Sequence, residues 1–247
     1  MAFSGYPIGN GIQRVYSAPD LPSQVADTAN PELFSGILAA DYAAISAAAR
    51  VRNYSRGEIL FLKGEIAQHV LLLTSGFVKI TQIGFAGNAA IVRVNSPGDV
   101  LGASGVLSGG RHDTTAYAFR ACRALSWEAG LFRVLAQRYP ILHQNMVGIL
   151  GRELLELEER FHEMATEKVG PRVIRQLMRL TSKMGVCVEH GIQINVSREE
   201  LAQMTGTTLF TVSRLLSSWE DMGAVKPSRE AVTICDHEVL LSTCLEQ

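Results

Sequence analysis

Residues 197–220, SREELAQMTGTTLFTVSRLLSSWE, contain two short helical patterns separated by a glycine. Ser197 precedes the first pattern and Glu200 follows three residues later, the spacing of a capping box at a helix N-terminus. The small Ala202 allows a second helix to cross closely, and Gly206 provides the turn. This stretch therefore predicts a helix-turn-helix, whose first helix begins at the capping box.

The second helix of this motif has an apolar face and a polar face. The apolar side chains that would pack against the first helix are Val212, Leu215, Leu216 and Trp219. The outer face is left to Phe210, Thr211, Ser213 and Arg214. An outward guanidinium presents two parallel donors, which match O6 and N7 of guanine in a major groove. The pattern indicates that Arg214 reads a base.

The surroundings of the motif support the same interpretation. Ser197, Thr208 and Thr211 carry short hydroxyls suited to phosphate oxygens. A short alternating strand is predicted at 192–196, and two strands around a turn, a wing, at 223–236. One exposed arginine also occurs in domains that bind no DNA, but the strand and the wing together favour DNA binding.

The charge is unevenly divided along the chain. The net formal charge is −1, but residues 166–230 hold nine Lys/Arg and seven Asp/Glu, a net of +2, which leaves −3 elsewhere. A basic C-terminal face has the sign that a nucleic-acid partner requires.

The composition is that of a folded protein, with 47% apolar and 19% charged residues. No apolar run is long enough to cross a bilayer and no basic-then-apolar leader is present, so we expect a cytoplasmic protein without membrane contact. The four cysteines are widely spaced, which suits reduced thiols.

Three patterns precede the motif. The first 30 residues mix Gly, Ser, Pro and Asn without periodicity, as in a flexible arm. Residues 31–54 have apolar side chains at helical spacing and predict one or two short helices. From about residue 50 to 127, short apolar runs are separated by glycines, which predicts a closed antiparallel barrel or sandwich.

A long helix is predicted from Pro140, where a missing N–H costs nothing. One strip of it recurs at intervals of four and three residues, the coiled-coil pattern. The strip consists of His143, Val147, Leu150, Leu154, Leu157, Phe161 and Met164. A strip this narrow favours pairing with the same helix of a second copy over packing within the chain. Gly170 and Pro171 are expected to end the helix and to form the hinge.

This arrangement resembles the CRP/FNR transcription regulators, in which a cyclic-nucleotide-binding-type β-roll, a dimer helix and a winged helix-turn-helix follow one another. In the β-roll the resemblance rests on Arg56-Gly57-Glu58, Lys63-Gly64-Glu65, Ser75-Gly76, Pro97-Gly98-Asp99 and Gly102 with Gly105. It implies an α+β fold with a jelly-roll-like antiparallel β-roll. The implied parts are an arm at 1–30, the β-roll at 31–139, the dimerisation helix at 140–169 and the winged domain at 170–247.

The resemblance also implies that three outward positions of the recognition helix contact bases, here Phe210, Ser213 and Arg214. The last two look like the FNR branch. Many members carry a glutamate where this chain has Phe210, and an aromatic ring packs on a thymine methyl instead of accepting from cytosine N4. We expect a two-fold-symmetric site with a guanine in each half-site, unlike the usual family consensus.

The cyclic AMP contacts of the family are largely missing. Members that bind it carry a glutamate for the ribose and an arginine for the cyclic phosphate, and those places hold Ala103 and His112, with Asp113 for the following serine. A one-residue shift of the alignment would instead bring Arg111 to the phosphate. Leu157 and Glu158 replace the hydroxyl-bearing positions of the long helix that touch adenine in those members.

Each lost charge-assisted contact is worth about 1.5–3 kcal/mol, so we expect that cyclic AMP is not the effector. A small molecule remains open, as does the absence of any effector. The tentative pocket comprises Gly102, Ala103, Ser104, Thr114, Thr115 and Leu157.

No cofactor or metal is predicted. The family's iron–sulfur members need an N-terminal cysteine set, but the first cysteine here is Cys122. Haem would need a ligand beside the dimer helix, for which His112, His143 and His162 are the candidates by position.

The sequence therefore predicts a DNA-binding transcription regulator that acts as a homodimer on double-stranded DNA, and the resemblance implies contact with RNA polymerase. The alternative is a cyclic-nucleotide-type regulatory module of a signalling protein, which would leave the wing unexplained. An enzyme is not predicted, because no nucleophile motif, metal spacing or phosphate loop is present. Activation and repression are equally compatible with the sequence.

Overall fold

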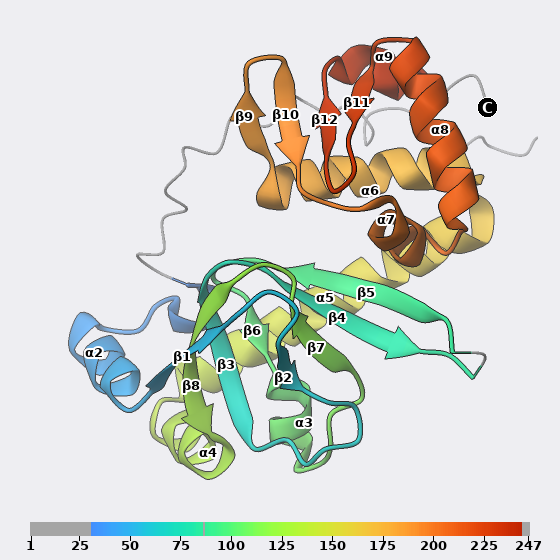
Figure 1. The fold of residues 1–247 in the computed structure, drawn as a ribbon. Coiled ribbons are helices and arrows are strands. Elements are labelled where there is room, and N and C mark those ends of the chain that lie inside the picture. Colours follow the sequence, from blue (N-terminus) through green and yellow to red (C-terminus); the bar gives the residue numbers. More distant parts are fainter. Residues whose placement is uncertain (1–30, 86, 244–247) are drawn as a thin grey trace, which may run out of the picture.

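A β-rich unit and a smaller helical unit are joined by one long helix in the computed structural model of this chain (Figure 1). The structure describes residues 31–85 and 87–243. The predicted N-terminal arm lies outside the described residues.

Two four-stranded antiparallel sheets form the first unit. One sheet has the order β1 (Arg50–Tyr54), β8 (Cys122–Glu128), β3 (His69–Ser75) and β6 (Val100–Leu101). The other has the order β2 (Ile59–Phe61), β7 (Thr115–Ala118), β4 (Val78–Ile83) and β5 (Ala89–Asn95). The antiparallel β-roll is therefore confirmed.

Alternation along the strands places apolar side chains between the two sheets. Leu71 and Leu73 of β3 share one buried cluster with Val78 and Ile80 of β4. The corner between these strands depends on Gly76, which has a φ of 77° and would bring a Cβ within 2.1 Å of the carbonyl oxygen of Ala121. Only glycine fits this corner without strain.

Short helices cover one end of the β-roll. They are η1 (Glu32–Phe34), α2 (Ala39–Ala47), α3 (Ala103–Ser108) and α4 (Ala129–Arg138). The predicted helical segment 31–54 and the predicted strand region from about residue 50 overlapped, and the strand prediction is correct for residues 50–54, which pair with β8 as an edge strand. Trp127 holds the covering helices on the sheet, since its buried indole nitrogen donates to the carbonyl of Ile45 at 2.8 Å.

The long helix α5 (Pro140–Thr166) begins at the predicted proline but ends earlier than predicted. Gly170 and Pro171 were expected to end it, and instead they lie in the first turn of α6 (Val169–Met184). A proline is tolerated there because the first N–H groups of a helix have no partner within the helix. The break between the helices falls at Glu167 and Lys168, which both have extended backbone angles.

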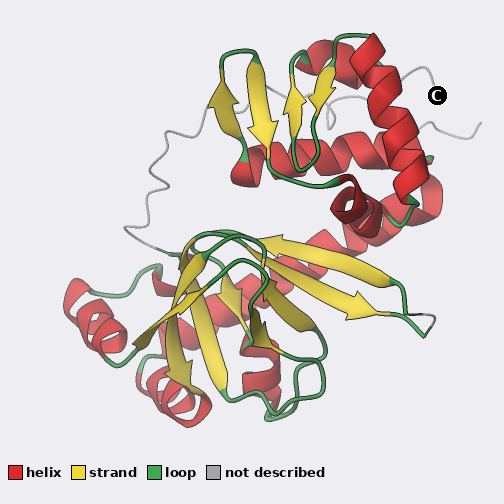
Figure 2. Cartoon of the chain, in the orientation of Figure 1, coloured by secondary structure: helices red, strands yellow, loops and turns green. Residues whose placement is uncertain are grey.

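The second unit is a winged helix-turn-helix (Figure 2). Its helices after α6 are α7 (Arg198–Thr205), α8 (Leu209–Asp221) and α9 (His237–Ser242). Its antiparallel sheet has the order β11 (Val225–Pro227), β12 (Val232–Ile234), β10 (Gly191–Ile194) and β9 (Val186–Val188). The predicted wing is the β11–β12 hairpin, and the predicted capping box at Ser197 and Glu200 is present.

The turn of the motif depends on Gly206. Its φ is 62°, and a Cβ on it would lie 2.7 Å from Cε of Met164 on α5. We predict that Gly206→Ala lowers the free energy of unfolding by about 1–2 kcal/mol, because a side chain in the left-handed region is strained. Denaturant titration measures this difference. The control is Gly130→Ala on α4, where a Cβ meets nothing within 4 Å, and an equal loss in both variants would contradict the explanation.

None of the helices within the described ranges is long and apolar enough to cross a membrane.

Candidate functional site

Helix α8 buries one face and leaves the other to solvent. Val212 and Leu216 are fully buried, and Trp219 is 1% exposed. On the opposite face Phe210 is 77% exposed and Arg214 is also exposed, while Ser213 is half-buried. The three positions that the sequence predicted to contact bases thus lie on the open side of the helix.

The hydroxyls predicted to meet phosphates lie at the two helix N-termini of the motif. Thr208 caps α8, since its Oγ1 accepts from the backbone N–H of Thr211 at 3.1 Å and lies 2.9 Å from the Thr211 hydroxyl. Ser197 caps α7 and its hydroxyl also donates to the carboxylate of Glu200 at 3.0 Å. Both hydroxyls are engaged in their caps, but Thr208 is exposed to solvent whereas Ser197 is half-buried.

The predicted dimer strip forms an uncovered apolar surface on α5. Five of its members are between 48% and 73% exposed: Val147, Leu154, Leu157, Phe161 and Met164. Leu150 differs, because it is half-buried against the β-roll core. A strip of large apolar side chains in contact with water is the usual mark of an interaction surface.

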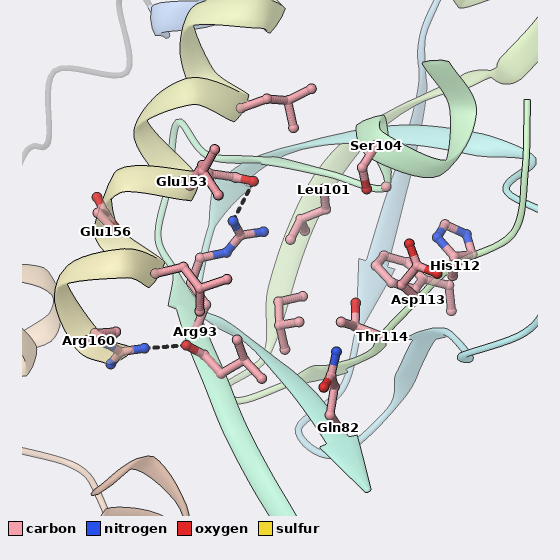
Figure 3. Close-up of a pocket in the computed structure, with 17 residues that line it drawn as sticks. Gln82, Arg93, Leu101, Ser104, His112, Asp113, Thr114, Glu153, Glu156 and Arg160 are labelled. Atoms are coloured by element: carbon pink, nitrogen blue, oxygen red, sulfur yellow. Dashed lines mark hydrogen bonds and ion pairs between the residues drawn. The ribbon is translucent and has the colours of Figure 1, made fainter. Parts of the chain in front are cut away.

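A cavity of about 280 Å³ lies between α5 and the β-roll (Figure 3). Of the tentative pocket residues, Gly102, Ser104, Thr114 and Leu157 line it. Ala103 and Thr115 do not line it, so these two assignments were wrong. Ala103 is buried in the cluster beneath the covering helices, and the Thr115 hydroxyl accepts from the backbone N–H of Lys63 at 3.0 Å.

An ion pair and a buried histidine dominate this cavity. Figure 3 shows Arg93 of β5 facing Glu153 of α5, with a guanidinium-to-carboxylate distance of 2.5 Å. His112 lies among the other lining residues and stacks on Phe61, with ring centroids 3.9 Å apart. Burial lowers the pKa of His112, so its ring is neutral at pH 7. Neither Arg93 nor Glu153 was recognised from the sequence.

Arg111 and His112 lie differently with respect to the cavity. Arg111 donates to the carbonyl of Gly64 at 2.7 Å and does not line the cavity, whereas His112 and Asp113 do. The remaining haem candidates, His143 and His162, are exposed on α5. Within the part of the chain that the structure describes, no three His, Cys, Asp or Glu side chains are close enough to hold a metal ion.

Comparison with known proteins agrees with this architecture. The family model of the cyclic nucleotide-binding domain matches residues 51–139, and that of the Crp-like helix-turn-helix domain matches residues 171–243. The chain belongs to the CRP/FNR family. It is a DNA-binding transcription regulator.

Individual relatives of this regulator are distant. A CRP-like cAMP-activated global transcriptional regulator of Mycobacterium tuberculosis is 23% identical, over 84% of this chain and 94% of that protein. The c-di-GMP-responsive global regulator CLP of Xanthomonas campestris has a TM-score of 0.72 at 20% identity, over 80% of this chain and 99% of that one. FixK2 of Bradyrhizobium japonicum has a TM-score of 0.68 at 21% identity, over 78% of this chain and 96% of that one.

The winged unit of the regulator is docked on its own β-roll. Ile91 and Val94 of β5 and Phe119 belong to the same buried cluster as the core of the winged unit. The ammonium of Lys79 lies 3.0 Å from the carboxylate of Glu200 on α7, and both side chains are largely buried. Burial alone would raise the pKa of Glu200, but hydrogen bonds from Ser197 and Lys79 outweigh it and lower the pKa.

The wing takes part in the same docking. Glu230, between β11 and β12, lies 2.8 Å from Arg56 of the β-roll. Arg120 donates to the carbonyl of Asn195, two residues before the capping-box residue Ser197. The helix-turn-helix is thus attached to the β-roll at its first helix and at its wing.

Proposed function

We propose that this regulator acts as a homodimer, which reads a two-fold-symmetric duplex site through Phe210, Ser213 and Arg214. The observation that carries the proposal is the exposed pair Phe210 and Arg214 on α8, opposite a fully buried apolar face. In helix-turn-helix proteins the second helix enters the major groove, and the side chains exposed on its N-terminal half contact the bases.

Base recognition follows from the chemistry of these side chains. The Arg214 guanidinium donates in parallel to O6 and N7 of guanine, and the Phe210 ring packs on a thymine methyl. Thr208 and Thr211, at the N-terminus of α8, contact phosphate oxygens and fix the register. Each half-site therefore contains one guanine whose recognition depends on Arg214.

Two copies pair along the exposed strip of α5. Support comes from the spacing of Val147, Leu154, Leu157, Phe161 and Met164 and from their exposure. Pairing in the coiled-coil manner would bury these side chains against their counterparts. It brings two α8 helices to successive major grooves, about 34 Å apart.

The effector of this regulator is not cyclic AMP. The support is chemical: the cavity contains neutral His112 and acidic Asp113 where a cyclic phosphate would need an arginine, and its one β-roll arginine, Arg93, is paired with Glu153. The relatives named above are themselves described as responding to different nucleotides. We propose a different small molecule in this cavity, or no effector.

We predict that cyclic AMP at millimolar concentration neither releases heat on titration nor changes the melting temperature of the protein. The reason is that the ribose and phosphate contacts, each worth about 1.5–3 kcal/mol, have no counterpart in the cavity. Isothermal titration calorimetry measures the binding directly. Micromolar affinity would contradict the assignment of His112 and Asp113.

We further propose that the protein carries no resident cofactor, is not an enzyme and contacts RNA polymerase when bound upstream of a promoter. Haem is the cofactor to test, because His112 borders the cavity and His143 and His162 are exposed on α5. A Soret band in the absorption spectrum of purified protein would show bound haem and would contradict the proposal that the protein carries no cofactor.

Selection of bound sequences from random DNA, with purified protein at moderate salt, tests the proposed function. The expected result is an inverted repeat with one guanine in each half-site and centres about one helical turn apart. Enrichment of no sequence, or of a single unrepeated element, would contradict it.

A further inference from the structure

A second cavity, also of about 280 Å³, lies where β5 meets α5 and α6. It adjoins the first cavity through Arg93 and Arg160 and extends to Arg179 and Lys183 of α6. Four cationic side chains therefore line one small space between the β-roll and the winged unit.

Two of these cations are neutralised and two are not. Arg93 is paired with Glu153 at 2.5 Å, and Arg179 with Glu163, to which its Nη1 donates at 2.8 Å. Arg160 and Lys183 have no carboxylate within ion-pair distance among the described residues.

The acceptors of Arg160 and Lys183 are neutral. Arg160 donates to the carbonyl of Val92 and, at 2.5 Å, to the side-chain oxygen of Gln176. Lys183 donates to the carbonyl of Val94 at 3.2 Å. Each cation retains further N–H groups, because a guanidinium has five and an ammonium three.

Arg179 has a donor that nothing satisfies. Its Nε is buried and has no hydrogen-bond partner among the described residues. Buried polar groups almost always have a partner, so each exception points to a missing acceptor. Arg179 itself is one of the residues that line the cavity.

The cations also disfavour one another. Burial, followed by the charge of Arg179, lowers the pKa of Arg160 to about 10, and the carboxylates of Glu163 and Glu156 offset only part of this effect. An anion placed among them would offset this repulsion. Glu156 and Glu159 also border the cavity, but both are exposed, and water screens them more effectively than it screens buried groups.

We propose that this cavity binds a small phosphate-bearing anion, which accepts hydrogen bonds from Arg160, Arg179 and Lys183. Its volume is just below the roughly 300–1,000 Å³ of pockets for drug-sized ligands, which favours a compact group such as a diphosphate. Arginine and lysine are the side chains that bind phosphate oxygens in proteins.

The bound anion would also join the two units. Arg160 on α5 and Lys183 on α6 each donate a hydrogen bond to a backbone carbonyl of β5. An anion bound between the two side chains would therefore strengthen the docking of the winged unit on the β-roll. This site does not depend on the proposed base contacts of α8, and its test contains no DNA.

Calorimetric titration of the purified protein with inorganic pyrophosphate, at constant ionic strength, tests the site. We expect one site per chain and a rise in melting temperature, because a ligand of the folded state stabilises it. Lys183→Gln should weaken the binding by roughly ten-fold or more, the worth of one charge-assisted hydrogen bond. Glu159→Gln should strengthen it, because it removes a repelling charge.

Two controls separate this cavity from other cationic surfaces. Lys63→Gln makes the same change of charge on an exposed loop of the β-roll and should leave the isotherm unchanged. Arg214→Ala should also leave it unchanged. If wild-type protein shows no saturable binding, or if Arg214→Ala abolishes it while Lys183→Gln does not, the proposal is wrong.

A parallel titration with ADP identifies the source of the phosphate group. Tighter binding of ADP than of pyrophosphate, lost in Lys183→Gln, assigns a nucleotide diphosphate, and the reverse order assigns the inorganic anion. Binding of ADP that survives Lys183→Gln together with no binding of pyrophosphate would contradict the site.

Discussion

Replacing Arg214 with alanine is expected to weaken binding to the selected operator by about 2–6 kcal/mol, because each bidentate arginine–guanine pair contributes about 1–3 kcal/mol and a dimer makes two. This corresponds to a loss of at least roughly thirty-fold in affinity. The same substitution should remove the preference for guanine at the contacted position. Fluorescence anisotropy at one fixed salt concentration, with operators that carry each base at that position, measures both effects.

The control for this variant is Arg138→Ala on α4. Arg138 is exposed and its guanidinium packs on the ring of Tyr139, far along the chain from the winged unit. Its loss should leave operator affinity unchanged. If Arg214→Ala weakened binding to all sequences equally, Arg214 would be a phosphate contact, and base reading would have to be assigned elsewhere on α8.

Leu154→Glu is expected to separate the proposed homodimer and to reduce operator affinity by roughly 100-fold or more. Leu154 is 56% exposed in one chain and lies at the middle of the strip on α5. A carboxylate there would face its twin across the seam, and a buried unpaired charge costs several kcal/mol. A single chain would retain only one half-site and would lose the second set of base and phosphate contacts.

Light scattering of the purified variant, coupled to size-exclusion chromatography, gives its mass directly. Leu131→Glu on α4 is the matched control, since this leucine is also exposed, at 39%, but lies outside the strip. It should leave the dimer and the operator affinity intact. A Leu154→Glu variant that remains a dimer would remove α5 as the interface.

Local chemistry explains why the winged unit could be predicted from the sequence. The capping box, the left-handed Gly206 and the buried face of α8 each depend on residues a few positions apart, and each was found where it was expected. The same holds for the start of α5 at Pro140. Features formed by residues that are close in the sequence can be predicted from one sequence, because the interactions that produce them are local.

The parts that could not be predicted depend on tertiary contacts. The sequence left residues 50–54 within both a helical and a strand prediction, and only their pairing with β8 decides for the strand. Glu200 was read only as a cap, whereas its partner Lys79 lies 121 positions away. The Arg93–Glu153 and Arg160–Val92 contacts likewise join distant segments, so the polar lining of both cavities was missed.

The residue at the phosphate position of the effector region also could not be assigned from the sequence alone. From the sequence, a shift of one residue exchanges Arg111 for His112 at the phosphate position. The structure distinguishes them, because Arg111 is directed to the carbonyl of Gly64 and His112 stacks on Phe61 inside the cavity. Both residues precede β7, and their placement depends on contacts with the distant residues Gly64 and Phe61, which the local sequence does not reveal.

Protection of guanine N7 from methylation tests the central claim most directly, because that atom is the one Arg214 is expected to cover in the major groove. Wild-type protein on its selected operator should protect one guanine in each half-site, about one helical turn apart, and Arg214→Ala should lose both protections at concentrations that still occupy the DNA. Unchanged protection in the variant, or protection confined to a single position, would contradict the account.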